Sequence, residues 1–129
     1  MRYIFFAFLL FFGITATAQK KKQSDCSFLK HSLLKYLDIE DTTAYVVINE
    51  NLHEEYHQDG KYFIKSKIVW QSDCEWTMTM TEITIPDFPF KPGEQMHVKI
   101  TRIDNDIIYY TSTVNGQSWP GRFRRMKQD

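Results

Sequence analysis

The feature that most constrains the fold of this chain is a strict alternation of apolar and polar residues in CEWTMTMT, residues 74–81. Cys74, Trp76, Met78 and Met80 share one parity, and the threonines take the other. Because successive side chains of a β-strand point to opposite faces, this pattern predicts a strand with one buried and one solvated face. The cysteine is therefore expected on the core side.

The same period of two recurs along much of the chain, with β-branched and aromatic residues at the apolar positions. Alternation of this kind is typical of antiparallel strands that are buried on one face only. Further strands are therefore expected over residues 44–49, 61–70, 96–103, 107–114 and 122–126.

Turn-forming residues separate these strands. Asp59-Gly60, the Asp-Asn-Asp sequence at 104–106 and Asn115-Gly116 are typical of tight hairpin turns. The proline-rich stretch 85–94 predicts a loop, and Pro120-Gly121 is expected to interrupt the last strand before residue 122.

These signals predict an all-β fold over residues 26–127, formed by a single antiparallel meander of about seven strands. Such a meander is expected to curl into a small barrel or a strongly bent sheet, because closure removes exposed strand edges. The comparison with lipocalins is an analogy of architecture alone.

Residues 26–37, CSFLKHSLLKYL, are ambiguous. Leu29, Leu33 and Leu37 fit a helical stripe that Ser24 or Asp25 could cap, so propensity favours a helix. A strand is the alternative.

Residues 1–18 have the features of a secretory signal peptide. Arg2 precedes an apolar run from Tyr3 to Ile14, and Ala16-Thr17-Ala18 predicts cleavage before Gln19. The run is shorter than the roughly 20 residues that span a bilayer, so no membrane span is expected after cleavage. We therefore expect a periplasmic or secreted protein.

A basic lead over residues 19–25 is expected to be disordered. Cys26 lies eight residues beyond Ala18, behind this polar stretch, which argues against a lipid-anchored terminus.

Cys26 and Cys74 are the two cysteines of the chain, and an oxidising compartment favours a disulfide between them. A reactive or metal-binding thiol is the alternative. Asp73 and Glu75 flank Cys74, and acidic neighbours raise a thiol pKa, which favours the disulfide.

Charge composition argues against nucleic acid as a partner. Without Arg2, 15 basic side chains face 16 acidic ones, so no long-range attraction toward polyanions is expected. The basic segment GRFRRMK, residues 121–127, is interpreted as a charged terminal strand.

HEEYH, residues 53–57, matches the HExxH pattern in which two histidines one helical turn apart bind zinc. The surrounding residues predict a strand instead, on which His53, Glu55 and His57 share a face and Glu54 points away. A metal site or zinc hydrolase that uses these three residues is therefore kept as an alternative function.

The leading hypothesis is a non-enzymatic binding or envelope-interaction module without a cofactor, and a monomer. A small apolar ligand is expected near Trp70, Trp76 and Tyr110 at the barrel mouth; an envelope protein is the other partner considered. A purely structural envelope protein is the third hypothesis.

The segments KSKIVWQSDCEWTMTM and GEQMHVKITRIDNDIIYY, with an early cysteine and an E-Y pair, resemble a family of small exported proteins of Bacteroidota-type bacteria. The family core reads I-x-W-x-S-D-C-E-Y, with Trp76 here in place of the tyrosine. Its members are uncharacterised, and some carry an automatic "DNA topoisomerase IV" label. A chain of 129 residues has no room for the nucleotide site and strand-cleaving domain that such an activity needs.

Overall fold

The computed structural model describes residues 25–128, and within this range the chain forms a closed antiparallel barrel with strands in sequential order. The all-β meander predicted from the sequence is thus confirmed, with eight strands instead of about seven. The strands are β1 (His31–Tyr36), β2 (Tyr45–Asn49), β3 (Leu52–His57), β4 (Tyr62–Ser72), β5 (Glu75–Ile83), β6 (Gln95–Asp104), β7 (Ile107–Val114) and β8 (Gln117–Met126).

The predicted signal peptide and all of the basic lead except Asp25 lie outside the described residues. Among residues 25–128, no helix has the length and apolar character needed to cross a membrane.

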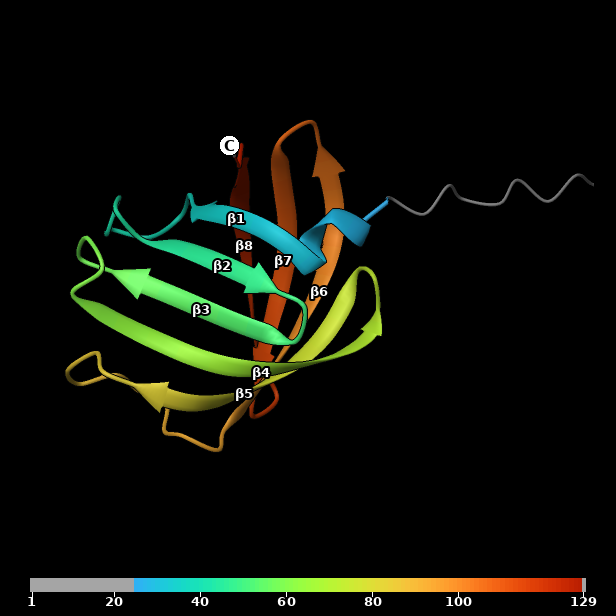
Figure 1. Ribbon diagram of the computed structural model, residues 1–129. Helices are drawn as coiled ribbons and strands as arrows, with labels where there is room; N and C mark the ends of the chain where they lie inside the picture. The colour runs from blue at the N-terminus through green and yellow to red at the C-terminus, as the bar shows by residue number, and fades with distance from the viewer. Residues whose placement is uncertain (1–24, 129) are drawn as a thin grey trace, which may run out of the picture.

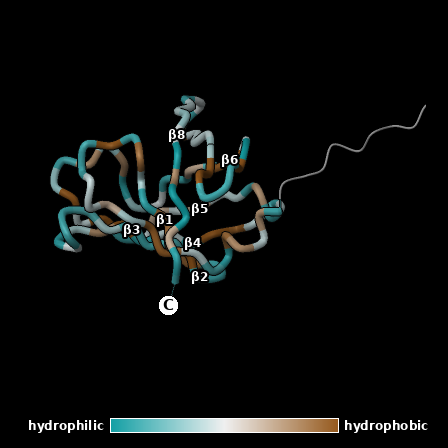
Figure 2. The backbone as a smooth tube through the Cα atoms, turned by 90° about the horizontal axis from the view of Figure 1, so that it is seen from above, coloured by the Kyte–Doolittle hydropathy of each residue, from teal (hydrophilic) through white to brown (hydrophobic). Residues whose placement is uncertain are grey.

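The barrel is flattened into two crossed layers. In Figure 1, β1 to β4 run across the view, while β6, β7 and β8 run steeply behind them. Apolar and polar segments alternate along the backbone in Figure 2, as expected for strands that face the interior on one side only. In β5 the buried residues are Trp76, Met78 and Met80, as the alternation predicts.

The helix favoured for residues 26–37 is wrong for most of that segment. A short 3-10 helix, η1, spans Ser27–Lys30, and the chain then enters β1. The strand pairs with β2 on one side and with β8 on the other, and this pairing closes the barrel. Because β1 buries Leu34 completely and satisfies backbone groups of two neighbours, these tertiary interactions outweigh helix propensity.

The expected break at Pro120-Gly121 is also wrong, because β8 runs through both residues. Pro120 lies opposite Thr111 of β7, whereas the pairing of β8 with β1 covers only residues 123–126. The Arg122 carbonyl, two residues further on, faces away from β7 and accepts the Leu37 N–H. The proline nitrogen therefore faces the same side of β8. At position 120 this side has no strand partner, so no hydrogen bond is lost there.

The end of the barrel where β1 begins is sealed by η1. Leu29 and Cys26 are buried there, and a disulfide joins Cys26 to Cys74, as predicted. Cys74 lies in the turn just before β5 and not within the strand. Next to this bridge, Lys30 Nζ lies 3.1 Å from the Asp73 carboxylate. The bridge and the ion pair together attach η1 to the β4–β5 turn.

Gly121 leaves space for an aromatic side chain on the neighbouring strand. Tyr110 lies directly opposite it, and a β-carbon at position 121 would overlap the Tyr110 hydroxyl and ring. The Tyr110 ring in turn stacks on Phe123, with 4.2 Å between ring centroids. This glycine therefore allows the tyrosine ring to cross the sheet surface into the interior.

Removing the disulfide is expected to destabilise the barrel strongly. For cysteines 48 residues apart, loss of the cross-link in Cys26→Ser/Cys74→Ser lowers the free energy of unfolding by up to about 4 kcal/mol in the chain-entropy model. Urea denaturation of the variant and the oxidised parent measures the difference. A change below about 1 kcal/mol would show that the bridge contributes little.

Gly121→Ala is expected to destabilise the protein by about 1–3 kcal/mol, because the added methyl group overpacks against Tyr110. In a Tyr110→Leu background the same substitution should cost much less. A double-mutant cycle measured by thermal unfolding tests this coupling, and additive effects would contradict the packing argument.

Candidate functional site

The barrel encloses a cavity of about 200 Å³. Side chains from β1 and from every strand from β3 to β8 line it, together with Ile39 from the β1–β2 loop and Phe88 from the β5–β6 loop. A cavity of about 150 Å³ already accommodates benzene. The interior is therefore large enough for a small organic molecule.

The two ends of the barrel differ. The end at η1 is sealed, whereas Ile39 and Phe88 belong to loops at the opposite end, which we call the mouth. Phe88 packs on Phe90, which packs edge-on against Trp119 of β8. Aromatic side chains of the β5–β6 loop thus cover part of the mouth.

A polar cluster lies inside the barrel near the mouth. The Tyr36 hydroxyl donates a hydrogen bond to Glu55 Oε1. His57 Nε2 lies 3.5 Å from Glu55 Oε2 without hydrogen-bond geometry, and His57 Nδ1 lies 3.7 Å from Asp41 Oδ2. The cluster connects the cavity wall to the β1–β2 loop through ionisable groups.

The pKa values in this cluster reflect both burial and charge. Burial alone would raise the pKa of the Glu55 carboxyl, but interaction with His57, His53 and the Tyr36 hydroxyl holds it below its usual range. The Glu55 carboxylate raises the pKa of His57, and burial lowers the pKa of His53. Glu55 is consequently ionised and His53 neutral at pH 7.

Three buried side chains that line the cavity have polar atoms without a hydrogen-bond partner. These atoms are His53 Nδ1, Ser66 Oγ and Trp76 Nε1, on side chains that are at most 3% exposed. His53 and Ser66 lie directly opposite each other on β3 and β4. Since buried polar groups in proteins are nearly always hydrogen-bonded, this group is suited to a polar ligand atom or to water.

The structure places two of the three predicted ligand residues in the cavity wall. Trp76 and Tyr110 line the cavity, and Trp70 does not. The Trp70 ring packs on Trp76 with 5.0 Å between centroids, and its Nε1–H donates to the Glu50 carbonyl. Trp70 therefore helps to build the sealed end and does not line the cavity.

HEEYH forms strand β3, so its histidines do not have the one-turn spacing of a helical zinc site. His53, Glu55 and His57 all face the cavity, as a strand requires. Glu54 points away and accepts a hydrogen bond from the Tyr56 hydroxyl. No group of three or more His, Cys, Asp or Glu side chains within the described range is arranged to hold a metal ion.

Several cavity residues were missed by the sequence analysis. Ser66 lies at an inward position between Ile64 and Ile68, where alternation alone could have indicated it. Tyr36 was missed because the structure of residues 26–37 was ambiguous. Phe123 was missed because the strand over residues 122–126 was interpreted only for its basic side chains.

The motif residues of the family resemblance lie mainly at the sealed end. Besides Cys74 and Trp70, Ser72 Oγ accepts the Cys74 N–H, and Asp73 pairs with Lys30. Glu75 Oε1 lies 2.7 Å from His97 Nε2. These contacts assign most of the motif to construction of the barrel base, whereas Trp76 lines the cavity.

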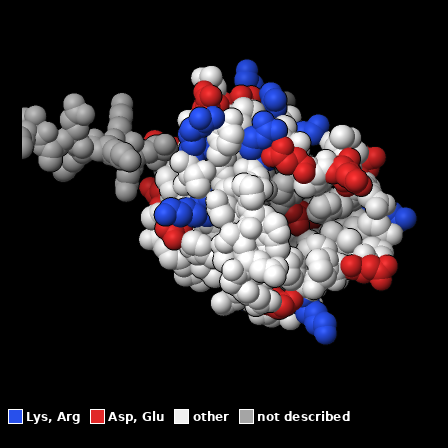
Figure 3. Space-filling model, turned by 180° about the vertical axis from the view of Figure 1, so that it is seen from behind, with Lys and Arg blue, Asp and Glu red and all other residues white. Residues whose placement is uncertain are grey.

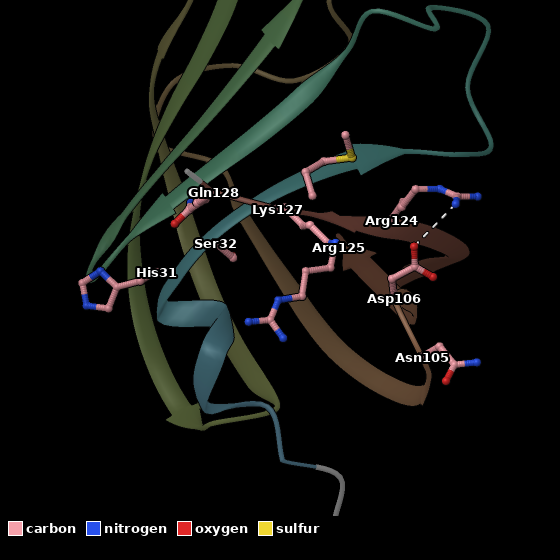
Figure 4. Close-up of a pocket in the computed structure, with 9 residues that line it drawn as sticks. His31, Ser32, Asn105, Asp106, Arg124, Arg125, Lys127 and Gln128 are labelled. Carbon is pink, nitrogen blue, oxygen red and sulfur yellow. Dashed lines mark hydrogen bonds and ion pairs between the residues drawn. The ribbon is translucent and has the colours of Figure 1, made fainter.

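An outer groove lies between the ends of β1 and β8 and the β6–β7 turn. Figure 4 shows Arg124, Arg125 and Lys127 along it, with Arg124 paired to Asp106. The Arg125 guanidinium lies over the Phe28 ring at 4.0 Å from its centroid. In Figure 3, basic and acidic side chains lie near one another along the upper part and the rim of the face, around a largely uncharged centre. The groove's two arginines thus already have partners within the barrel.

Comparison with protein-family models, curated proteins and solved structures gives no match to this chain.

The Glu55 carboxylate is expected to set the titration of His57. In the folded protein His57 should titrate above its ordinary pKa of 6.5. The stability that its protonated form contributes is therefore fully present below pH 6.5 and is lost as the pH rises through the folded pKa. In Glu55→Gln the His57 pKa should fall, whereas Glu54→Gln should leave it unchanged. An NMR titration of the imidazole nitrogens measures this, and equal pKa values in the parent and Glu55→Gln would refute the coupling.

Proposed function

We propose that this protein is a non-enzymatic binding module that holds a small, mostly apolar molecule with a polar group inside its barrel. The proposal includes export, cleavage after Ala18 and action in the periplasm or outside the cell, in keeping with the resemblance to small exported proteins. The ligand enters at the mouth, past Ile39 and Phe88.

One observation carries the proposal: the cavity wall is largely apolar, yet three of its side chains, His53, Ser66 and Trp76, have buried polar atoms without a partner in the protein. Binding sites for small molecules combine an apolar enclosure with a few convergent polar groups. A barrel that served only as a structural element gains nothing from unpaired polar atoms in its interior, since each costs about 1–3 kcal/mol.

The metal-binding alternative lacks comparable support. It requires ligands that converge on one point, and no such group occurs in residues 25–128. A purely structural envelope protein would be expected to have a filled core, and the cavity of about 200 Å³ argues against that alternative.

Binding is tested by titrating the purified protein with indole while recording the tryptophan side-chain N–H signals by NMR. The Trp76 signal should shift in a saturable manner, because Trp76 lines the cavity. Native mass spectrometry of the freshly purified protein should also detect a bound small molecule. An unchanged Trp76 signal together with no co-purified molecule would refute the proposal.

Filling the cavity should weaken binding. Ser112 lines the cavity and is 9% exposed, so the added side chain of Ser112→Leu is expected to weaken indole binding by about tenfold or more. Thr111→Leu, at the adjacent position, which does not line the cavity, is the matched control. Equal affinities in the two variants would place binding elsewhere.

A further inference from the structure

The ionisable side chains of the described residues that line the cavity include a carboxylate but no lysine or arginine. Among its lining residues in the described part of the chain, Glu55 is the single carboxylate, and no lysine or arginine is present. His53 is buried and neutral, because burial lowers its pKa. His57 is the one lining group that can offset the Glu55 charge as a cation. The positive charge of a protonated His57 is also attracted to the Asp41 carboxylate, which lies 3.7 Å from its other ring nitrogen.

The Glu55 carboxylate has acceptor capacity left over. A carboxylate offers about four lone-pair positions. Oε1 accepts the Tyr36 hydroxyl, and Oε2 has His57 Nε2 at 3.5 Å without the geometry of a hydrogen bond. A donor entering from the cavity can therefore bond to this carboxylate without displacing the Tyr36 interaction.

Tyr36, which donates to this carboxylate, belongs to a cluster of aromatic rings in the cavity wall. Tyr36 packs on Phe123 at 5.0 Å between centroids, and Phe123 stacks on Tyr110. Burial and the nearby Glu55 charge raise the pKa of Tyr110, so its ring stays uncharged. Aromatic faces attract cations through their quadrupole, whereas an anion in the same place would meet the Glu55 charge.

We propose that the molecule held in the barrel carries a protonated amine, which donates to the Glu55 carboxylate while its apolar body lies among Tyr36, Tyr110 and Phe123. This inference rests on the proposed function and specifies the chemical class of its ligand. Small aromatic or aliphatic primary amines fit both the charge and the size of the cavity.

Three probes of matched size test the inference: phenethylamine, phenethyl alcohol and phenylacetate, which differ mainly in the charge of the terminal group. Each is titrated into the purified protein at pH 7.5 by calorimetry and by the Trp76 N–H signal. Phenethylamine should bind about tenfold or more tightly than the alcohol, as expected for a charge-assisted hydrogen bond, and phenylacetate most weakly.

Glu55→Gln should abolish the preference for the amine while the alcohol still binds. Glu54→Gln is the matched control, because Glu54 is the adjacent glutamate on the opposite face of β3 and should keep the wild-type order. The comparison of the three probes on the wild-type protein tests the inference even if Glu55→Gln fails to fold.

The outcomes separate the two proposals. If the alcohol or phenylacetate binds as tightly as phenethylamine, the amine inference is wrong and the binding function stands. If Glu55→Gln retains the amine preference, the carboxylate is not the recognition group and the inference is equally wrong. If neither indole nor any of the three probes binds, and no molecule co-purifies, the proposed function itself fails.

Discussion

The architecture depends on the pairing of β1 with β8. This ladder joins residues 33–36 to residues 123–126, and the Arg122 guanidinium extends it with a bidentate ion pair to Asp38, 84 residues away in sequence. Closing the sheet encloses an interior from which water can be excluded. Without the β1–β8 ladder, Tyr36 and Phe123, which lie opposite each other in it, would no longer form a common wall.

Because the interior is enclosed, the negative charge of Glu55 is largely shielded from water. A buried carboxylate is costly unless hydrogen bonds or an opposite charge compensate it. The protein supplies one hydrogen bond from Tyr36 and a loosely placed His57 near the mouth. This partial compensation distinguishes the polar cluster from the sealed end, where Lys30 and Asp73 form a direct pair at the surface. The disulfide and the direct ion pair thus lie at one end of the barrel, and the incompletely compensated Glu55 carboxylate lies near the other.

Much of the fold could be predicted from local patterns. The alternation of Trp76, Met78 and Met80 reports a one-sided strand directly, and Asn115 and Gly116 both adopt the positive φ angles of the hairpin turn that their sequence indicates. The prediction failed where distant pairing decided the outcome. Helical spacing is seen for Leu29, Leu33 and Leu37, but hydrogen bonding to β2 and β8 makes residues 31–36 a strand. Pro120 is tolerated because one side of β8 has no partner at that point.

The candidate site was less accessible to sequence reasoning. His53, Glu55 and His57 were noticed through a motif whose helical context is absent, although their common strand face was expected correctly. The cavity arises from side chains on seven strands, so its volume depends on packing and on closure that no local pattern encodes. The roles of Ser66 and Tyr36 in the cavity wall depend on residues from other strands. Ser66 lies opposite His53, and Tyr36 donates to Glu55.

Pro120 also affects how the barrel meets other copies of itself. The first half of β8 lacks a neighbour on its outer side, and a bare strand edge is a template for aggregation. At the centre of this edge is Pro120, which has no amide hydrogen, and two residues further on the Arg122 side chain is paired with Asp38. The residue that looked like a strand breaker thus protects the seam of the barrel against edge-to-edge association.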